Sequence, residues 1–137
     1  MDNQQSHTTE HTSTQQIATK GQRIVAFAID ALIVSAISWI FGGLSGFIIF
    51  AVYMLTRDAW PFLNGVSVGK KLMKIRAVDA DGNPLINNWE LSAKRNILLL
   101  GWGLGALIEG VMLIINDEDQ RLGDQWFQTR VIQDETL

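Results

Sequence analysis

Two acidic residues stand inside long apolar stretches of the chain, where an ionised carboxylate is costly. Residues 24–55 contain a single charge, Asp30, and residues 96–116 contain a single charge, Glu109. An unpaired carboxylate inside a bilayer costs about 2.5–3.5 kcal/mol on insertion scales. Both residues are therefore candidates for binding a proton or an ion, or for anchoring helices through an ion pair.

Asp30 needs a cation from another part of the chain. Arg23 precedes it by seven residues, which places the two on one helix face but about 10 Å apart along the axis. The candidate partners are Arg95, Lys94 and Arg57. We favour Arg95, because a guanidinium can bond a carboxylate through two parallel hydrogen bonds. Two interpretations stay open: Asp30 titrates in a transport path, or it locks two helices together through Arg95.

Glu109 lies six residues before Ile115, deep in the last apolar segment. Intramembrane acids are candidates for function, and this position is one. The alternative is a headgroup or solvent-facing position, if the helix that carries Glu109 lies obliquely at the membrane interface. Both interpretations stay open.

The elements that must position these charges are predicted to be helical hairpins. A helix needs about 20 residues to cross a ~30 Å hydrocarbon core, so the first apolar run is too long for one span. The stretch GGLSG at 42–46 interrupts it with three glycines, which suit a tight turn. We expect one span at about 22–41 and a second at about 45–63, with Arg57 reaching the headgroups.

The second apolar run is divided by another glycine-rich stretch, GWGLG at 101–105. It predicts a shorter second hairpin, with helices at about 88–101 and 104–122. The alternative is one span at about 97–115, which would place the C-terminus on the opposite face of the membrane.

Two strand-like segments, 74–79 and 129–133, are predicted to pair outside the membrane. This pairing places both segments on one side, which favours two hairpins. With two hairpins all eleven Lys and Arg residues also share one side, which the positive-inside tendency identifies as cytoplasmic. The sequence thus predicts an all-α membrane protein of four short membrane-embedded helices with a small cytoplasmic β-pairing. Three spans are the alternative.

The composition defines the ends of the domain and excludes several classes of function. Residues 1–19 are polar and predict a disordered tail, residues 20–133 the membrane domain, and residues 134–137 a flexible C-terminus. There is no cysteine and both histidines are in the tail, so we expect no enzyme, metal site or cofactor. No basic tract is dense enough for nucleic acid. The expected partners are the lipid bilayer and either a second copy or another membrane protein.

A basic segment follows the first predicted hairpin. It contains Lys70, Lys71, Lys74 and Arg76. Basic segments close to a membrane attract anionic lipid headgroups. They support a second functional hypothesis, that of a non-catalytic accessory or assembly protein that docks a partner or anionic lipid through this segment.

Several motifs together resemble the RDD family of small bacterial membrane proteins, which is named for an arginine and two aspartates. The matching pieces are RIVAFAID at 23–30, GVSVGKKL at 65–72, IRAVD at 75–79, Asp81-Gly82, Arg95, LGD at 122–124 and TRVI at 129–132. Taken in chain order, these matching pieces span about residues 20–133. On this resemblance the name-giving residues are Arg23, Asp30 and Asp124. The family commonly has a histidine before its last aspartate, where this chain has Gly123.

The resemblance implies a protein of the bacterial cytoplasmic membrane. The predicted hairpins and the distribution of Lys and Arg make it multi-pass, with a cytoplasmic N-terminus. Cation/proton antiport is proposed for some members, so the resemblance implies an ion- or proton-coupled module. Its intramembrane charge network would comprise Arg23, Asp30, Arg95 and Asp124, with Glu109 as an addition outside the family pattern. A chain of 137 residues could hardly enclose a pathway alone, so transport would imply an oligomer. The small residues of the two glycine-rich turns suit close helix contacts.

Overall fold

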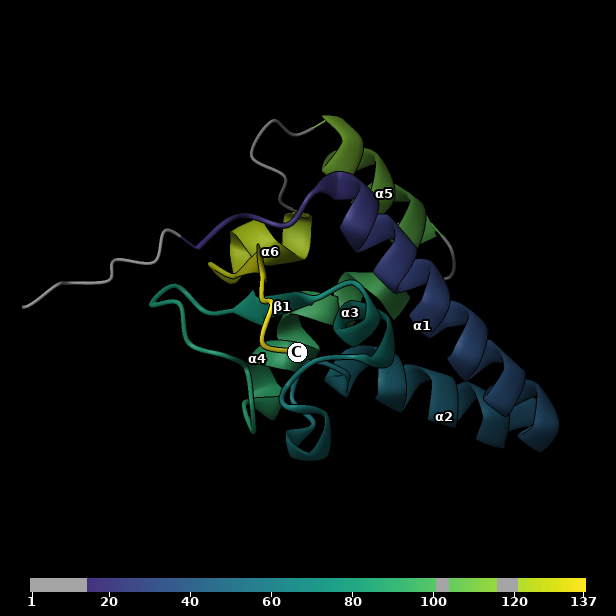
Figure 1. The fold of residues 1–137 in the computed structure, drawn as a ribbon. Helices are drawn as coiled ribbons and strands as arrows, with labels where there is room; N and C mark the ends of the chain where they lie inside the picture. The colour runs from purple at the N-terminus through teal and green to yellow at the C-terminus, as the bar shows by residue number, and fades with distance from the viewer. Residues whose placement is uncertain (1–14, 101–103, 116–120) are drawn as a thin grey trace, which may run out of the picture.

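The computed structural model describes residues 15–100, 104–115 and 121–137. Figure 1 shows a long helical hairpin at one end and short helices with a two-stranded sheet at the other. In chain order the elements are α1 (Lys20–Phe41), α2 (Gly43–Thr56), η1 (Pro61–Leu63), α3 (Val68–Leu72), β1 (Ile75–Val78), α4 (Trp89–Asn96), η2 (Ile97–Leu100), α5 (Leu104–Ile115), α6 (Leu122–Trp126) and β2 (Arg130–Gln133). The described chain is therefore mostly helical.

The first hairpin begins at a defined cap and turns at glycine. Thr19 and Gln22 form a capping box, in which each side chain bonds the backbone N–H of the other. Gly42 ends α1 with a positive φ of 59°, a conformation that suits glycine. α2 then packs back along α1, and a Cβ at Gly46 would overlap the carbonyl oxygen of Ser38. Close packing of the two helices therefore requires glycine at position 46.

The second helix of this hairpin is shorter than the sequence predicts. It ends at Thr56, whereas the expected span ran to about 63. Pro61 disfavours helical geometry in the residue before it, and Trp60 is accordingly extended, with φ −65° and ψ 116°. Arg57 and Asp58 follow the last helical residue and are buried. The expectation that Arg57 reaches the headgroups is therefore wrong.

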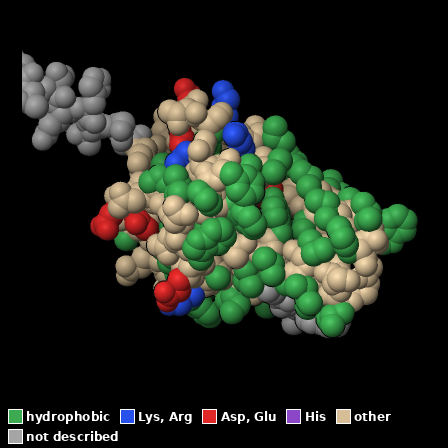
Figure 2. Space-filling model, turned by 90° about the horizontal axis from the view of Figure 1, so that it is seen from below, with side chains coloured by type: hydrophobic (Ala, Val, Ile, Leu, Met, Phe, Trp, Pro, Cys, Tyr) green, Lys and Arg blue, Asp and Glu red, His purple; other side chains and the backbone are tan. Residues whose placement is uncertain are grey.

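α1 is the one described helix that is by itself long and apolar enough to cross a membrane. Its 22 residues are about 33 Å long, and its most apolar window is only 17% buried. The 14 residues of α2 reach about 21 Å, and they pass the same test only together with Pro61–Leu72, across a bend of 61°. Figure 2 shows hydrophobic side chains gathered towards the end of the molecule formed by α1 and α2.

The second apolar run forms α4, η2 and α5. With 12 residues, α5 is only about 18 Å long, well short of a ~30 Å core. Its C-terminal end lies beside the start of α1, because the Nζ atom of Lys20 donates to the carbonyl oxygen of Ile114 at 3.0 Å. The predicted turn at 101–105 lies partly outside the described residues, since residues 101–103 are not described.

The two strands pair antiparallel, with Ile75 opposite Gln133 and Val78 opposite Arg130. They belong to the two segments that the sequence suggests as partners. Residues 16–18 extend this arrangement: the N–H of Ala18 donates to Val131, and Ile17 bridges to Ile132. These residues, which the sequence assigns to the polar tail, are thus held against the sheet.

Two small apolar cores stabilise the packing of α1 against other elements, one against the sheet and one against α2 and η2. Ala18, Ala26, Ile75 and Val131 form one between α1 and the sheet. Val34, Met54 and Leu99 form the other between α1, α2 and η2. Buried charged residues occupy the space between the two cores, and they form the site.

Candidate functional site

Eight charged side chains are buried around the open end of the α1–α2 hairpin. They are three aspartates and five basic residues, namely Asp30, Asp58, Asp124, Arg23, Arg57, Lys70, Arg95 and Arg121. Burying so many charges is unfavourable unless each carboxylate is paired and hydrogen-bonded. Each of the three aspartates meets this condition in its own way.

Asp30 is fully buried and accepts from three donors. Its carboxylate bonds Arg57 Nη1 at 2.9 Å, the Tyr53 hydroxyl at 3.1 Å and the backbone N–H of Gly69 at 2.7 Å. The expected pairing of Asp30 with Arg95 is therefore wrong. The physical reason is the hairpin, which returns the end of α2 to the level of Asp30 and brings Arg57 with it.

Gly69 reaches Asp30 because it has no side chain. A Cβ built on it would overlap the backbone carbonyl of Ala26 in α1. The short helix α3, capped by the side chain of Ser67, is thereby held directly against α1. The glycine of the predicted basic segment thus positions an N–H donor for the buried carboxylate.

Asp124 of α6 connects the first helix to α4 and to Thr129, which precedes β2. It is bonded by Arg23, by Arg95 Nη2 at 2.6 Å and by the Thr129 hydroxyl at 3.2 Å. Burial by itself would raise the pKa of Asp124, but the charges of Arg95, Arg121 and Arg23 outweigh burial and lower that pKa below its ordinary value. The carboxyl group therefore stays ionised at neutral pH.

Arg23 thus pairs with Asp124, which is 101 positions away. Three of the residues that the sequence analysis names as a charge network meet in one place, namely Arg23, Arg95 and Asp124. Asp30 belongs to the same buried region but has its own partners. Glu109 is part of α5, and its side chain lies outside the described part of the structure.

Asp58 is the buried aspartate that sequence reasoning missed. It pairs with Lys70, accepts from Asn96 Nδ2 at 3.2 Å, and lies 3.7 Å from Arg95 Nη1. The signal in the sequence was an adjacent Arg57-Asp58 pair directly after an apolar run. A charged pair at this position is typical of the polar end of a span, whereas both side chains are buried here.

The basic segment does not form one exposed patch. Lys70 is buried against Asp58, and Arg76 forms an ion pair with Asp134, with 2.8 Å between Nε and Oδ2. Lys71 and Lys74 are exposed. Two of the four basic residues of this segment are thus paired within the fold, and Lys71 and Lys74 remain exposed to a partner or to lipid.

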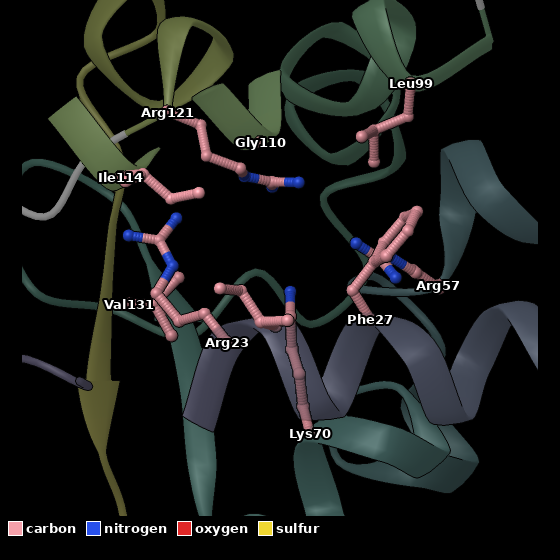
Figure 3. A pocket seen from close by; sticks show the side chains of 10 residues that line it. Arg23, Phe27, Arg57, Lys70, Leu99, Gly110, Ile114, Arg121 and Val131 are labelled. Carbon is pink, nitrogen blue, oxygen red and sulfur yellow. The ribbon is translucent and has the colours of Figure 1, made fainter. Parts of the chain in front are cut away.

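The eight buried charged side chains form one ion cluster, and a cavity of about 250 Å³ lies beside it. Figure 3 shows the side chains of Arg23, Arg57, Lys70 and Arg121 around it. Its remaining described lining residues are apolar or glycine, namely Ile24, Phe27, Leu99, Gly110, Ile114 and Val131. No Asp or Glu is among the lining residues that the structure describes. An anion in this cavity would meet positive groups from four segments of the chain.

The described residues include no group of three or more side chains suited to hold a metal ion. The donor set of the cavity, guanidinium and ammonium N–H groups, is instead suited to oxyanions such as phosphate and carboxylate.

Comparison of the chain with known protein families gives a match. The family model described as RDD matches residues 42–128, more than half of the chain. The match contains Arg57, Asp58, Lys70, Arg95 and Asp124, and it begins after α1. Neither the curated proteins nor the solved structures gave a match. The chain belongs to the RDD family and is an integral membrane protein.

Proposed function

We propose that this RDD protein lies in the bacterial cytoplasmic membrane with four embedded helical segments, α1, α2, α4–η2 and α5. The proposed cytoplasmic side is the end that carries the ion cluster and the sheet. All eleven Lys and Arg residues lie outside residues 24–56 and 96–120, which contain most of α1, all of α2, and η2 with α5; Lys94 and Arg95 lie in the last turn of α4, at the cytoplasmic entry of the second hairpin. This distribution supports a cytoplasmic N-terminus.

Its proposed activity is the non-enzymatic binding of an anionic ligand in the cavity. The observation that carries this proposal is the lining: three arginines and one lysine from different segments surround about 250 Å³ of space. Cationic groups held in a partly desolvated pocket attract anions more strongly than the same groups in water. Handling such a ligand across the membrane would require an oligomer, since a single chain offers few helices for a pathway.

Arg121→Gln tests the cavity by removing one of its four cations. The Arg121 side chain lies near two residues of the cluster, with Nη2 3.4 Å from Asn96 Oδ1 and Nε 3.7 Å from Asp124 Oδ2. We expect the variant to bind phosphate-bearing probes about thirtyfold more weakly or worse, since removing one charged partner of a buried anion costs about 2–5 kcal/mol. The measurement is equilibrium binding of phosphatidic acid and of inorganic phosphate to the full chain in detergent.

The matched control for this experiment is Arg130→Gln. Arg130 is exposed in β2 and does not line the cavity, yet replacing it with glutamine removes the same charge. We expect the control to bind as the unchanged protein does. If neither probe binds, or if both variants lose the same amount, the anion-binding proposal is wrong.

Cation- or proton-coupled transport through Asp30 is the second hypothesis, and Asp30→Asn tests it. Asp30 is fully buried, accepts from three donors and does not line the cavity, which supports an anchoring role. We therefore expect the amide to lower the melting temperature and the amount of inserted protein, because it leaves the charge of Arg57 uncompensated. Cation-driven proton flux in liposomes, normalised to inserted protein, should not be lost selectively. A normally stable variant without flux would establish the coupled mechanism instead.

The docking hypothesis has less support. Two of its four basic side chains, Lys70 and Arg76, are engaged in ion pairs within the fold. Lys71 and Lys74 remain as exposed charges of this segment.

A further inference from the structure

The cationic cavity reaches the apolar outer surface of the protein. Ile24 of α1 and Ile114 of α5 both line it, and they are 44% and 62% exposed. A residue that lines a cavity and is also exposed marks a place where the cavity opens. Figure 3 places Ile114 on the same side of the cavity as Arg121 and Arg23. The opening therefore lies between two helices whose outer faces are apolar.

These outer faces are suited to lipid. α1 exposes Val25 and Leu32, and α5 exposes Val111 and Ile115. At the end of the gap, the Nζ atom of Lys20 bonds the carbonyl oxygen of Ile114 and ties α1 to α5. A positive charge at this level lies where a headgroup region would begin. The gap between α1 and α5 is thus apolar on its outer side and is bordered by positive charges on its inner side.

The interior of the cavity has the same two-part character. Arg23, Arg57, Lys70 and Arg121 supply the charges, while Phe27, Leu99 and Val131 supply apolar walls. The volume of about 250 Å³ is roughly eight times the ~30 Å³ of one water molecule. A small free anion would leave most of this space empty or filled with water against apolar walls. An anion joined to hydrocarbon would fill it.

We propose that the ligand is a phosphate group carried by a lipid. The phosphate lies among the four cations, and the first part of its hydrocarbon chain leaves the cavity between α1 and α5, past Ile24 and Ile114. This inference rests on the proposed anion-binding function and specifies its ligand. Guanidinium groups such as those of Arg23 and Arg121, which line the cavity, bind phosphate oxygens through paired hydrogen bonds.

The first test compares three probes on the unchanged full-length protein in detergent. They are phosphatidic acid, glycerol phosphate and inorganic phosphate, which share the phosphate group but differ in the hydrocarbon. We expect phosphatidic acid to bind at least about tenfold more tightly than the other two, because burial of apolar chain adds about 0.8 kcal/mol per methylene group. Equal binding of all three would overturn the lipid proposal and leave the anion-binding proposal standing.

The second test obstructs the opening with Ile114→Trp. We expect this variant to lose phosphatidic acid binding about tenfold or more while binding of inorganic phosphate changes little. The matched control is Ile115→Trp, because Ile115 is 70% exposed, neighbours Ile114 and does not line the cavity. If both tryptophan variants bind the lipid as the unchanged protein does, entry between α1 and α5 is wrong. If none of the three probes binds in a manner that depends on Arg121, both proposals fail.

Discussion

Replacing Asp124 with asparagine is expected to lower the free energy of unfolding by about 3–5 kcal/mol, the usual cost of removing one partner of a buried ion pair. Asp124 is fully buried and joins Arg23 of α1, Arg95 of α4 and the Thr129 hydroxyl. An amide has the same shape but no charge to offset these guanidinium groups. Thermal or denaturant unfolding of the detergent-purified protein, followed by tryptophan fluorescence, measures the loss.

The effect of this substitution should depend on pH with a defined sign. The pKa of Asp124 is lowered in the folded protein, against the effect of burial, by Arg95, Arg121 and Arg23. A carboxyl group of this kind contributes stability that is fully present above its unfolded pKa of about 3.9 and is lost as the pH falls towards the folded value. The difference between the unchanged protein and the variant should therefore be constant from about pH 5 to 8 and shrink in stronger acid.

Asp81→Asn is the matched control for this prediction. Asp81 is an exposed residue of the turn after β1, and the same chemical change there should alter stability by no more than about 0.5 kcal/mol. Equal stabilities of the two variants at neutral pH would show that the cluster around Asp124 contributes nothing. A difference that grows with acid would contradict the assignment of an ionised carboxylate.

Gly69→Ala is the second change with a large expected effect. The added Cβ would overlap the carbonyl group of Ala26, so α3 must move away from α1. The backbone N–H of residue 69 then loses its hydrogen bond to Asp30. Overpacking typically costs 1–3 kcal/mol, and the lost hydrogen bond to a charged group adds about 1.5–3 kcal/mol. We expect a loss of about 3 kcal/mol or more in the same unfolding measurement.

Gly21→Ala controls for the general effect of replacing a helical glycine. A Cβ at Gly21 would have no atom within 4 Å, and the residue lies within α1. Alanine there should be neutral or stabilise by up to about 1 kcal/mol, because glycine is the poorer helix former. If Gly69→Ala behaves in the same way, the close contact between α3 and α1 does not support the fold.

The helical regions could be inferred from the sequence because their signals are local. The family could be inferred because each of its motifs is short and can be recognised without knowing the fold. Gly42 to Gly46 mark the turn of the first hairpin, and Pro61 with Trp60 mark where helical structure cannot continue. The RDD motifs are spread along the chain in a fixed order, and the family match confirms the resemblance. The length of α2 was overestimated because hydropathy at 57–63 does not report that Arg57 and Asp58 turn inward.

The sequence alone determined that Asp30 requires a partner, since an isolated carboxylate in an apolar helix is too costly to leave unpaired. Only the tertiary structure decided which partner it has, because Arg57, Arg95 and Lys94 are equivalent as charges and differ only in where the chain places them. The same holds for Arg23 and Asp124, which are 101 residues apart. The cavity is likewise a product of packing: four cations become one site, although they lie in α1, at the end of α2, in α3 and at the start of α6.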